Sequence, residues 1–431
     1  MKQCVFKGLY GAFCAVLLIA KVSAADFSAG FAINAHTNHN DNIRLTQNDQ
    51  KASTEYQLSP KIDLGVNTET SQLLLTSTLN FNRYSLSEYN SDDQNIALGL
   101  SHQFENSFAG LDLNYVHNST LTSELLTSGQ IGTRADRAEK YDISPTWAYT
   151  VNERNTIQMS ATYTTQNYES SSYLGYDNKS AELDWLHQLN ERLKFILATS
   201  YSDYQSDDRS ITVYGLLLGI FPIPVGTQSY TTRTQTKDIQ LGAEYQISEN
   251  STLSGRFGRS RNDTTQPVKD PSNFCAYGDQ LIGAVCSTIP HSVNFGTTAN
   301  LSWTWNNEQQ RFKLNATKLV QPTSNGYAVD AIQIQPSWSY QLTELDSISI
   351  DASIVRNRAI DKTTNLLNTS LADRDYGSAT LRYQRRLTES WLFSTSYRYS
   401  NQKYSSTDYQ ASAHVYSLGI TYQPQRWHWS R

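Results

Sequence analysis

Apolar and polar residues alternate along many stretches of this chain. In residues 56–66, Leu58 and Ile62 belong to an apolar set and Ser59 to the polar set between them. A period of two residues places one set on each face of a β-sheet. The polar sets are rich in Ser, Thr, Asn and Gln, which suit water and are costly against lipid. The pattern therefore predicts strands with a wet face and an apolar face. It recurs in 141–151, 293–305 and 332–342.

Short polar turns that each carry a Glu separate many of these stretches. They span residues 68–70, 152–154, 190–192, 248–250, 307–309, 343–345 and 388–390. Between successive turns the chain runs out, crosses a longer loop and runs back. Short turns at one end and long loops at the other are typical of outer-membrane barrels. The chain is predicted to be all-β: a transmembrane antiparallel up-and-down β-barrel.

The alternating stretches give about eighteen strands, with sixteen as the alternative, and both counts fall in the range of such barrels. Both chain termini then lie at the end with the short turns. Long loops are expected near 121–138, 207–232, 265–290 and 361–373. The expected strand centres are residues 32, 60, 78, 98, 114, 145, 162, 183, 199, 240, 257, 298, 315, 336, 353, 381, 397 and 417.

Aromatic residues sort along the predicted strands. All eight Trp lie near a short turn or near the C-terminus. Many Tyr lie toward the long loops. Because amphipathic rings favour the headgroup layer, the sorting predicts two aromatic girdles. The Tyr girdle would contain Tyr84, Tyr89, Tyr168, Tyr173, Tyr204, Tyr230, Tyr327, Tyr404 and Tyr409.

The N-terminal residues resemble an export signal. Lys2 and Lys7 precede a short apolar core at 11–20, and Val22-Ser23-Ala24 offers a small-residue cleavage site. We expect a signal peptide at 1–24 and a barrel at 25–431. No later stretch is apolar for the ~18 residues that a membrane helix needs.

Charge and motifs exclude several other function classes. The formal net charge is −5 and no basic stripe is present, which argues against a nucleic-acid partner. The histidines are scattered, and no phosphate-binding Gly loop or zinc-ligand cluster is present. We therefore expect neither an enzyme nor a cofactor.

Charged residues in the polar sets are predicted to face the lumen. Those of both signs could pair across the pore and stabilise its wall. Arg382, Arg386 and Arg398 belong to neighbouring strands and could instead form a basic ladder for an anionic cargo. Both interpretations stay open. The lumen-facing candidates are Lys61, Asp63, Glu182, Asp184, Glu244, Arg256, Asp351, Arg382, Arg386 and Arg398.

Two loops carry features of their own. The apolar segment 213–226 could fold into the mouth as a constriction, or rest against the outer leaflet or a partner. Cys275 and Cys286 lie in one loop of an exported chain, which favours a disulfide between them over free thiols. His291 alone does not supply the further ligands of a metal site.

Short motifs resemble those of a known family. They are Asn38–Ile43, Leu58-Ser59-Pro60, Ile143-Ser144-Pro145 and Asn152-Glu153-Arg154. They resemble the β-barrel porins encoded with exopolysaccharide and exosortase systems in Gram-negative bacteria. The last strand, Ser417–Tyr422, resembles the signal read by the barrel-assembly machinery. The resemblance implies an outer-membrane pore that releases polysaccharide with a periplasmic export protein, and it carries over no site residues.

The preferred hypothesis is an outer-membrane channel for export of an exopolysaccharide. Its expected partners are outer-membrane lipid, the barrel-assembly machinery, the polysaccharide cargo and a periplasmic polysaccharide-export protein. A general diffusion porin for small solutes and a non-conducting surface barrel are the alternatives.

Overall fold

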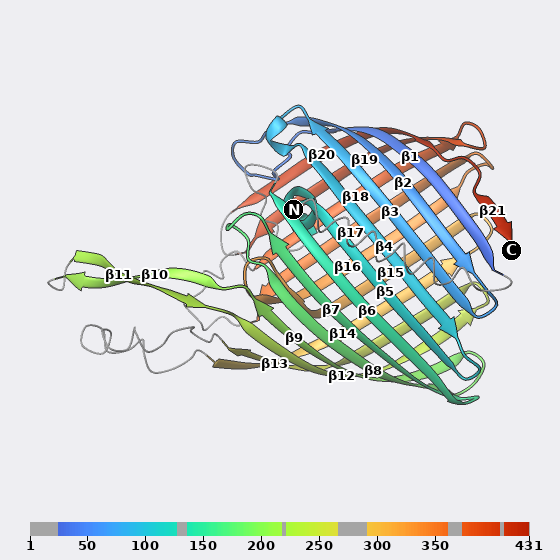
Figure 1. Ribbon diagram of the computed structural model, residues 1–431, viewed down its shortest axis with the longest axis horizontal. Coiled ribbons are helices and arrows are strands. Elements are labelled where there is room, and N and C mark those ends of the chain that lie inside the picture. Colours follow the sequence, from blue (N-terminus) through green and yellow to red (C-terminus); the bar gives the residue numbers. More distant parts are fainter. Residues whose placement is uncertain are drawn as a thin grey trace.

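The computed structural model describes residues 25–126, 136–217, 221–265, 291–360, 373–405 and 409–430. Within them, nineteen strands form one antiparallel sheet, which closes into a barrel (Figure 1). Strands β1 to β9 pair in chain order, β9 pairs with β12, β12 to β20 again pair in order, and β20 returns to β1.

Eighteen of these strands form the barrel wall. The nineteenth, β21, follows β20 along the same edge of β1. The predicted fold and the count of eighteen are therefore confirmed, and each predicted centre falls inside one strand. The strands are β1 (Asp26–Asn40), β2 (Ser53–Asn67), β3 (Ser71–Tyr84), β4 (Ser91–Gln103), β5 (Ser107–Ser119), β6 (Arg137–Asn152), β7 (Asn155–Tyr168), β8 (Tyr176–Gln188), β9 (Leu193–Ser206), β12 (Arg233–Ser248), β13 (Ser251–Thr265), β14 (His291–Asn306), β15 (Gln310–Pro322), β16 (Ala328–Gln341), β17 (Asp346–Ala359), β18 (Arg374–Arg386), β19 (Trp391–Tyr404), β20 (Gln410–Tyr422) and β21 (Trp427–Ser430).

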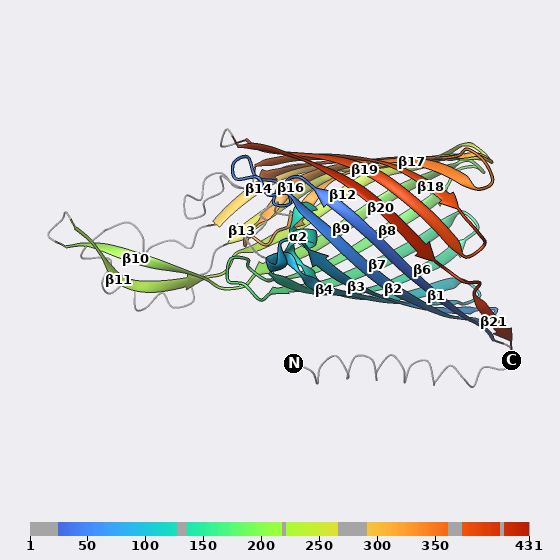
Figure 2. The same cartoon turned by 90° about the horizontal axis from the view of Figure 1, so that it is seen from above.

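The short turns gather at one end of the barrel, here called the turn end, and the longer connections lie at the other, the loop end (Figures 1 and 2). Asn307 shows why Asn or Thr opens these turns: its Oδ1 accepts hydrogen bonds from the backbone N–H groups of Gln309 and Gln310. The residues between β4 and β5, 104–106, form an eighth short turn with a Glu, which the sequence analysis missed.

The outer face of the wall is apolar. Large hydrophobic side chains on alternate strand positions are exposed, including Leu241 at 68% and Phe295 at 77%. Water does not favour so much exposed apolar surface on a closed barrel, whereas the hydrocarbon core of a membrane does. No helix in the described part of the chain is long and apolar enough to cross a membrane.

Three small elements lie at the loop end. They are a 3₁₀ turn η1 (Ser87–Tyr89), a helix α2 (Thr120–Leu126), and a hairpin of β10 (Arg209–Leu217) and β11 (Phe221–Tyr230). The hairpin projects away from the barrel (Figures 1 and 2). Of the two interpretations of segment 213–226, its described residues therefore do not support a constriction folded into the mouth. The two strands, residues 209–217 and 221–230, pair with each other outside the wall.

The chain closes its barrel seam with an interrupted last strand. β20 pairs with β1 only as far as Ile33, opposite Tyr422. After a short irregular stretch, β21 pairs with residues 26–29 at the start of β1, and the ring of Trp429 stacks on Phe27 at 5.6 Å. Arg426, in the irregular stretch, lies over Gly30 and reaches Asp63 on β2 (Nη2 to Oδ2, 3.6 Å). The seam at the turn end thus depends on residues beyond the predicted last strand.

Candidate functional site in the barrel lumen

The inner face of the wall differs between the two ends of the barrel. Inner side chains toward the turn end are exposed or half-buried, and Lys313, Asp351 and Arg382 are among the exposed ones. Inner side chains toward the loop end are buried. The lining of the lumen is therefore accessible at the turn end and tightly packed at the loop end. The buried set includes Asn82, Asp93, Gln166, Thr236, Asn262, Val329, Asn357 and Gln402.

Helix α2 is fixed to the wall where it enters the loop end. Ser119 Oγ accepts a hydrogen bond from the backbone N–H of Leu121 (3.2 Å), which caps the first helical turn. The carboxylate of Asp93 on β4 accepts hydrogen bonds from the Ser119 N–H (3.1 Å) and from Arg137 Nη1 (2.7 Å). Ser119 ends β5 and Arg137 begins β6, so both strands that flank the helix are tied to one carboxylate.

The carboxylate of Glu124 on α2 joins different sides of the barrel. Its side chain is fully buried. Oε1 accepts a hydrogen bond from the hydroxyl of Tyr168 on β7 (2.6 Å), and Oε2 accepts one from Ser324 Oγ in the loop between β15 and β16. Its charge also acts on the buried guanidinium of Arg374 on β18. By the strand order, α2 and the loop of Ser324 start from nearly opposite parts of the wall, so these contacts cross the mouth.

The loop of residues 323–327 turns inward to meet Glu124. Its turn uses Gly326 at φ +80°, where a Cβ would lie 2.5 Å from Leu174 Cδ1. The backbone N–H of Leu174 donates to the carbonyl of Ser324 (2.7 Å), and the hydroxyl of Tyr204 donates to the carbonyl of Thr323 (3.3 Å). The loop is therefore held from the far wall by backbone and side-chain hydrogen bonds.

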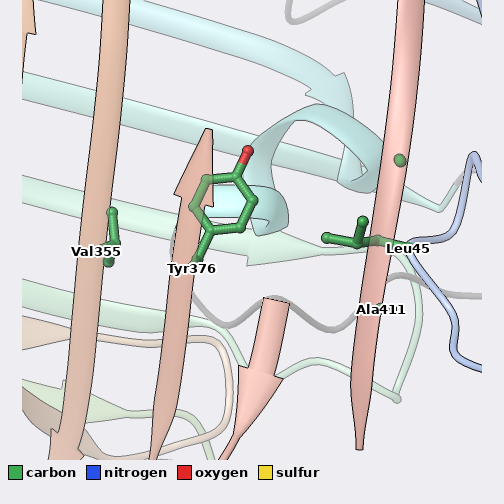
Figure 3. Close-up of a cluster of buried hydrophobic side chains, with 5 residues drawn as sticks. Leu45, Val355, Tyr376 and Ala411 are labelled. Atoms are coloured by element: carbon green, nitrogen blue, oxygen red, sulfur yellow. The ribbon is translucent and has the colours of Figure 1, made fainter. Parts of the chain in front are cut away.

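The loop of residues 41–52 packs over another part of the inner wall. Leu45 adopts φ 50°, a left-handed conformation that is costly for leucine, and its side chain is buried. It packs against Val355, Tyr376 and Ala411 on β17, β18 and β20 (Figure 3). The Tyr409 hydroxyl donates to the Leu45 carbonyl (2.9 Å). Apolar burial thus holds this loop against the inner face of the barrel.

The prediction of a second aromatic girdle is wrong for most of its members, because they are buried. Tyr204 and Tyr404 lie on the inner face, since each is two residues from a buried inner residue of its strand, Ser206 and Gln402. Position along a strand gives the height of a Tyr in the wall, but a girdle also requires that the Tyr face outward. Other buried members lie in loops that fold inward. The buried members are Tyr89, Tyr173, Tyr204, Tyr327 and Tyr404.

Six of the predicted lumen charges form local ion pairs. Arg256 on β13 reaches across two strands to Glu182 (2.6 Å) and Asp184 (3.4 Å) on β8. Glu244 pairs with Lys194 on the neighbouring strand (2.9 Å). Lys61 pairs with Asp63 (3.1 Å), which also faces Arg426.

The other four predicted lumen charges have no ion-pair partner among the described residues: Asp351, Arg382, Arg386 and Arg398. All four are exposed. Pairing with nearby charges along the wall therefore describes β2 and the strands from β8 to β13, and it does not describe the four charges on β17 to β19. None of these pairs spans the pore.

One carboxyl group at the loop end has a perturbed pKa. Asp207 lies between β9 and β10, and its backbone N–H donates to the Gly175 carbonyl (2.8 Å). Burial, followed by the nearby carboxylates of Asp177 and Asp208, raises the pKa of Asp207. The side chain remains exposed, and its surroundings favour the neutral form more than water does.

Cys275 and Cys286 lie outside the described residues, as does the predicted signal peptide. In the described part of the chain, no group of His, Cys, Asp and Glu side chains is placed to hold a metal ion. The main feature that the sequence analysis missed is α2 and its Glu124. A Ser before a run of helix-forming residues that includes Glu and Leu is a helix-start signal, and it was present at 119–126.

No protein-family model and no curated protein sequence matches the chain. Similar solved structures include OpdQ of Pseudomonas aeruginosa, with 10% identity over 93% of this chain and 98% of that one and a TM-score of 0.42. OccK8 (OprE) of the same organism has 9% identity over 92% and 98% of the two chains, with a TM-score of 0.41. The ferric-catecholate import receptor Fiu of E. coli K12, in its open form, has 10% identity over 92% and 81%, with a TM-score of 0.41. Likenesses at this level do not indicate a cargo.

Proposed function

We propose that this chain is an outer-membrane channel that exports an exopolysaccharide and closes at its loop end between export events. The observation that carries the proposal is the contrast between the two halves of the lumen: exposed polar walls toward the turn end, and a packed mouth centred on Glu124 at the loop end. A polymer entering from the turn end would meet a wide wet vestibule, and only the mouth would need to rearrange.

Barrel size and wall chemistry support a hydrated polymer as the cargo. Barrels of sixteen to eighteen strands enclose an aqueous lumen. The inner wall offers many hydroxyl and amide groups, such as those of Ser337, Ser349, Gln384 and Ser396 on β16 to β19. Many weak hydrogen bonds favour sliding along the wall over tight binding at one point, because each is readily exchanged with water.

A periplasmic export protein would deliver the polymer at the turn end. The chain has no nucleotide-binding motif, so the direction of transport would come from that partner. Insertion of the barrel would depend on the barrel-assembly machinery. Both partners belong to the proposal.

Gene deletion in the native host tests the export function. We expect extracellular polysaccharide to fall and intracellular polymer to accumulate, with recovery when the wild-type gene is restored. Extracellular polymer at the wild-type level in the deletion strain would refute export as the function.

The packed mouth also favours a second candidate, a non-conducting surface barrel. The buried contacts of Glu124 with Tyr168 and Ser324 would then be permanent structure. Planar-bilayer recordings separate the candidates, because a gated channel opens when these contacts are removed and a solid plug does not. A general diffusion porin has less support, since such a pore would stand open at rest.

A further inference from the structure

Charge is unevenly distributed around the inner wall. The inner positions of β14 to β20 that are charged are basic with one exception, Asp351. The inner positions of β2 to β12 hold most of the lumen carboxylates. On the basic wall these residues are Arg311, Lys313, Arg374, Arg382, Arg386 and Arg398; on the acidic wall the carboxylates are Glu55, Asp63, Asp93, Asp112, Asp142, Glu182, Asp184, Asp238 and Glu244.

Local cations reduce the charge of the acidic wall. Asp142 is 3.1 Å from Lys140, and Lys61, Lys194 and Arg256 pair with the carboxylates described above. On the basic wall, no carboxylate of the described residues lies within ion-pair distance of Arg382, Arg386 or Arg398. The exposed carboxylates of Asp112 and Asp351 also have no ion pair among the described residues, but the unpaired exposed cations outnumber them. The charge that remains available to a ligand in the lumen is therefore largely positive, and its cations lie on one side.

The register shows how these arginines are spaced. On β18, Thr380 lies opposite Arg398 of β19, and Arg382 and Arg386 follow on the same inner face. From the level of Thr380 to Arg386, the strand advances six residues, which is roughly 20 Å at a strand rise of about 3.3 Å per residue. The three guanidinium groups thus form a strip from mid-barrel to the turn end.

The strip continues sideways onto β15. Lateral rows of the sheet connect Arg382 through Ser349 and Ser339 to Arg311. They also connect Arg398 through Thr380, Asp351 and Ser337 to Lys313. Arg311 and Lys313 are also exposed. Apart from Asp351, the side chains between these cations are hydroxyls, so the surface combines positive charge with hydrogen-bonding groups.

We propose that Arg382, Arg386 and Arg398 bind the acidic groups of an anionic polysaccharide as it passes through the lumen. This inference rests on the proposed export function and adds the charge class of the cargo. A guanidinium group donates paired hydrogen bonds to a carboxylate or sulfate and stays charged at all physiological pH values. Because the groups are exposed, each contact is weak and screened, so a chain moves from one arginine to the next.

Binding of a defined oligosaccharide to the purified full-length barrel tests the inference. The probe is fluorescently labelled oligogalacturonate, with an uncharged malto-oligosaccharide of equal length as the comparison, and the readout is fluorescence anisotropy in detergent at low and high salt. The test variant is R382Q/R386Q/R398Q. The matched control is R154Q/R192Q/R261Q, which removes three exposed arginines from two turns and from the outer face of β13.

We expect the wild type to bind the oligogalacturonate more tightly than the neutral sugar, and salt to weaken that binding. The test variant should lose about tenfold in affinity, since each of the three exposed ionic contacts contributes about twofold. The control should change less than about twofold. The variant R382K/R386K/R398K, which keeps the charge, should bind the acidic sugar better than the glutamine variant. Heat-dependent gel mobility checks that every variant is a folded barrel.

Equal binding of the two sugars, no binding of the acidic one, or equal losses in the test and control variants would overturn the inference. The export function has its own separate readout, the secreted polymer of the deletion strain. A strain that fails to secrete, together with a barrel that does not prefer acidic sugars, would keep the channel and assign it a neutral cargo.

Discussion

Replacing Glu124 with alanine should open the loop end. The carboxylate accepts hydrogen bonds from Tyr168 and Ser324 and is fully buried, so its removal leaves both hydroxyls without this acceptor. Hydrogen bonds to charged groups contribute about 1.5–3 kcal/mol each. The two contacts together therefore stabilise closure by about 3–6 kcal/mol, before any effect on the buried Arg374 is added.

This magnitude sets the expected change in gating. A loss of about 3 kcal/mol, the lower bound, shifts a two-state equilibrium by a factor of more than about 100. A wild-type barrel that is almost always closed in a planar lipid bilayer should therefore become one with frequent openings. Glu124→Gln should have an intermediate effect, because its carbonyl oxygen still accepts one hydrogen bond and its amide group accepts none.

The matched control is Glu88→Ala. Glu88 lies in η1 at the same end of the barrel and is exposed, so its removal should leave conductance unchanged. Single-channel recordings at equal amounts of reconstituted barrel measure the effect. If Glu124→Ala opens no more often than the wild type while the protein remains a folded barrel, Glu124 does not stabilise a closed state and the closure model fails.

Three further perturbations have defined outcomes. Gly326→Ala places a Cβ at φ +80° against Leu174, a strain of about 1–2 kcal/mol, and should increase channel openings about five- to thirtyfold over wild type in the same recordings; unchanged openings would contradict the role assigned to the 323–327 loop. Asp207 donates its N–H to Gly175, beside Leu174, whose own N–H donates to Ser324. Because the pKa of Asp207 is raised in the described structure, closure should be most stable where the carboxyl is neutral and should weaken as pH rises through the raised pKa. Asp207→Asn should therefore remove this pH dependence of channel opening and close the channel more firmly at pH 7; a variant with the wild-type pH profile would refute the assignment. Truncation after Arg426 removes β21 and the stack of Trp429 on Phe27, which contributes about 0.5–1.5 kcal/mol beyond its buried area, and should lower the temperature at which the barrel loses its compact mobility on a gel; an unchanged temperature would mean that β21 does not stabilise the seam.

The sequence alone was sufficient to predict the barrel fold. A strand with one lipid face and one wet face must alternate at every step, so the pattern around Leu58 and Ile62 determined both the strand and its faces. The short turns were equally local, because the side chain of a residue such as Asn307 satisfies the turn's own backbone N–H groups. Strand order then followed, since short turns allow only neighbouring antiparallel strands.

The state of the lumen was decided only by the tertiary structure. Glu124, Ser324 and Tyr168 are far apart in the chain, and no local pattern records that loops from opposite walls meet. The same holds for charge: alternation predicts that Arg256 and Arg398 face inward, but pairing depends on which carboxylates the closed sheet brings near. Arg256 has Glu182 within 2.6 Å, whereas Arg398 has no carboxylate of the described residues within ion-pair distance. Strand periodicity is a property of consecutive residues, while the packing at the loop end and the ion pairs between strands arise because the curved, closed sheet brings distant residues together.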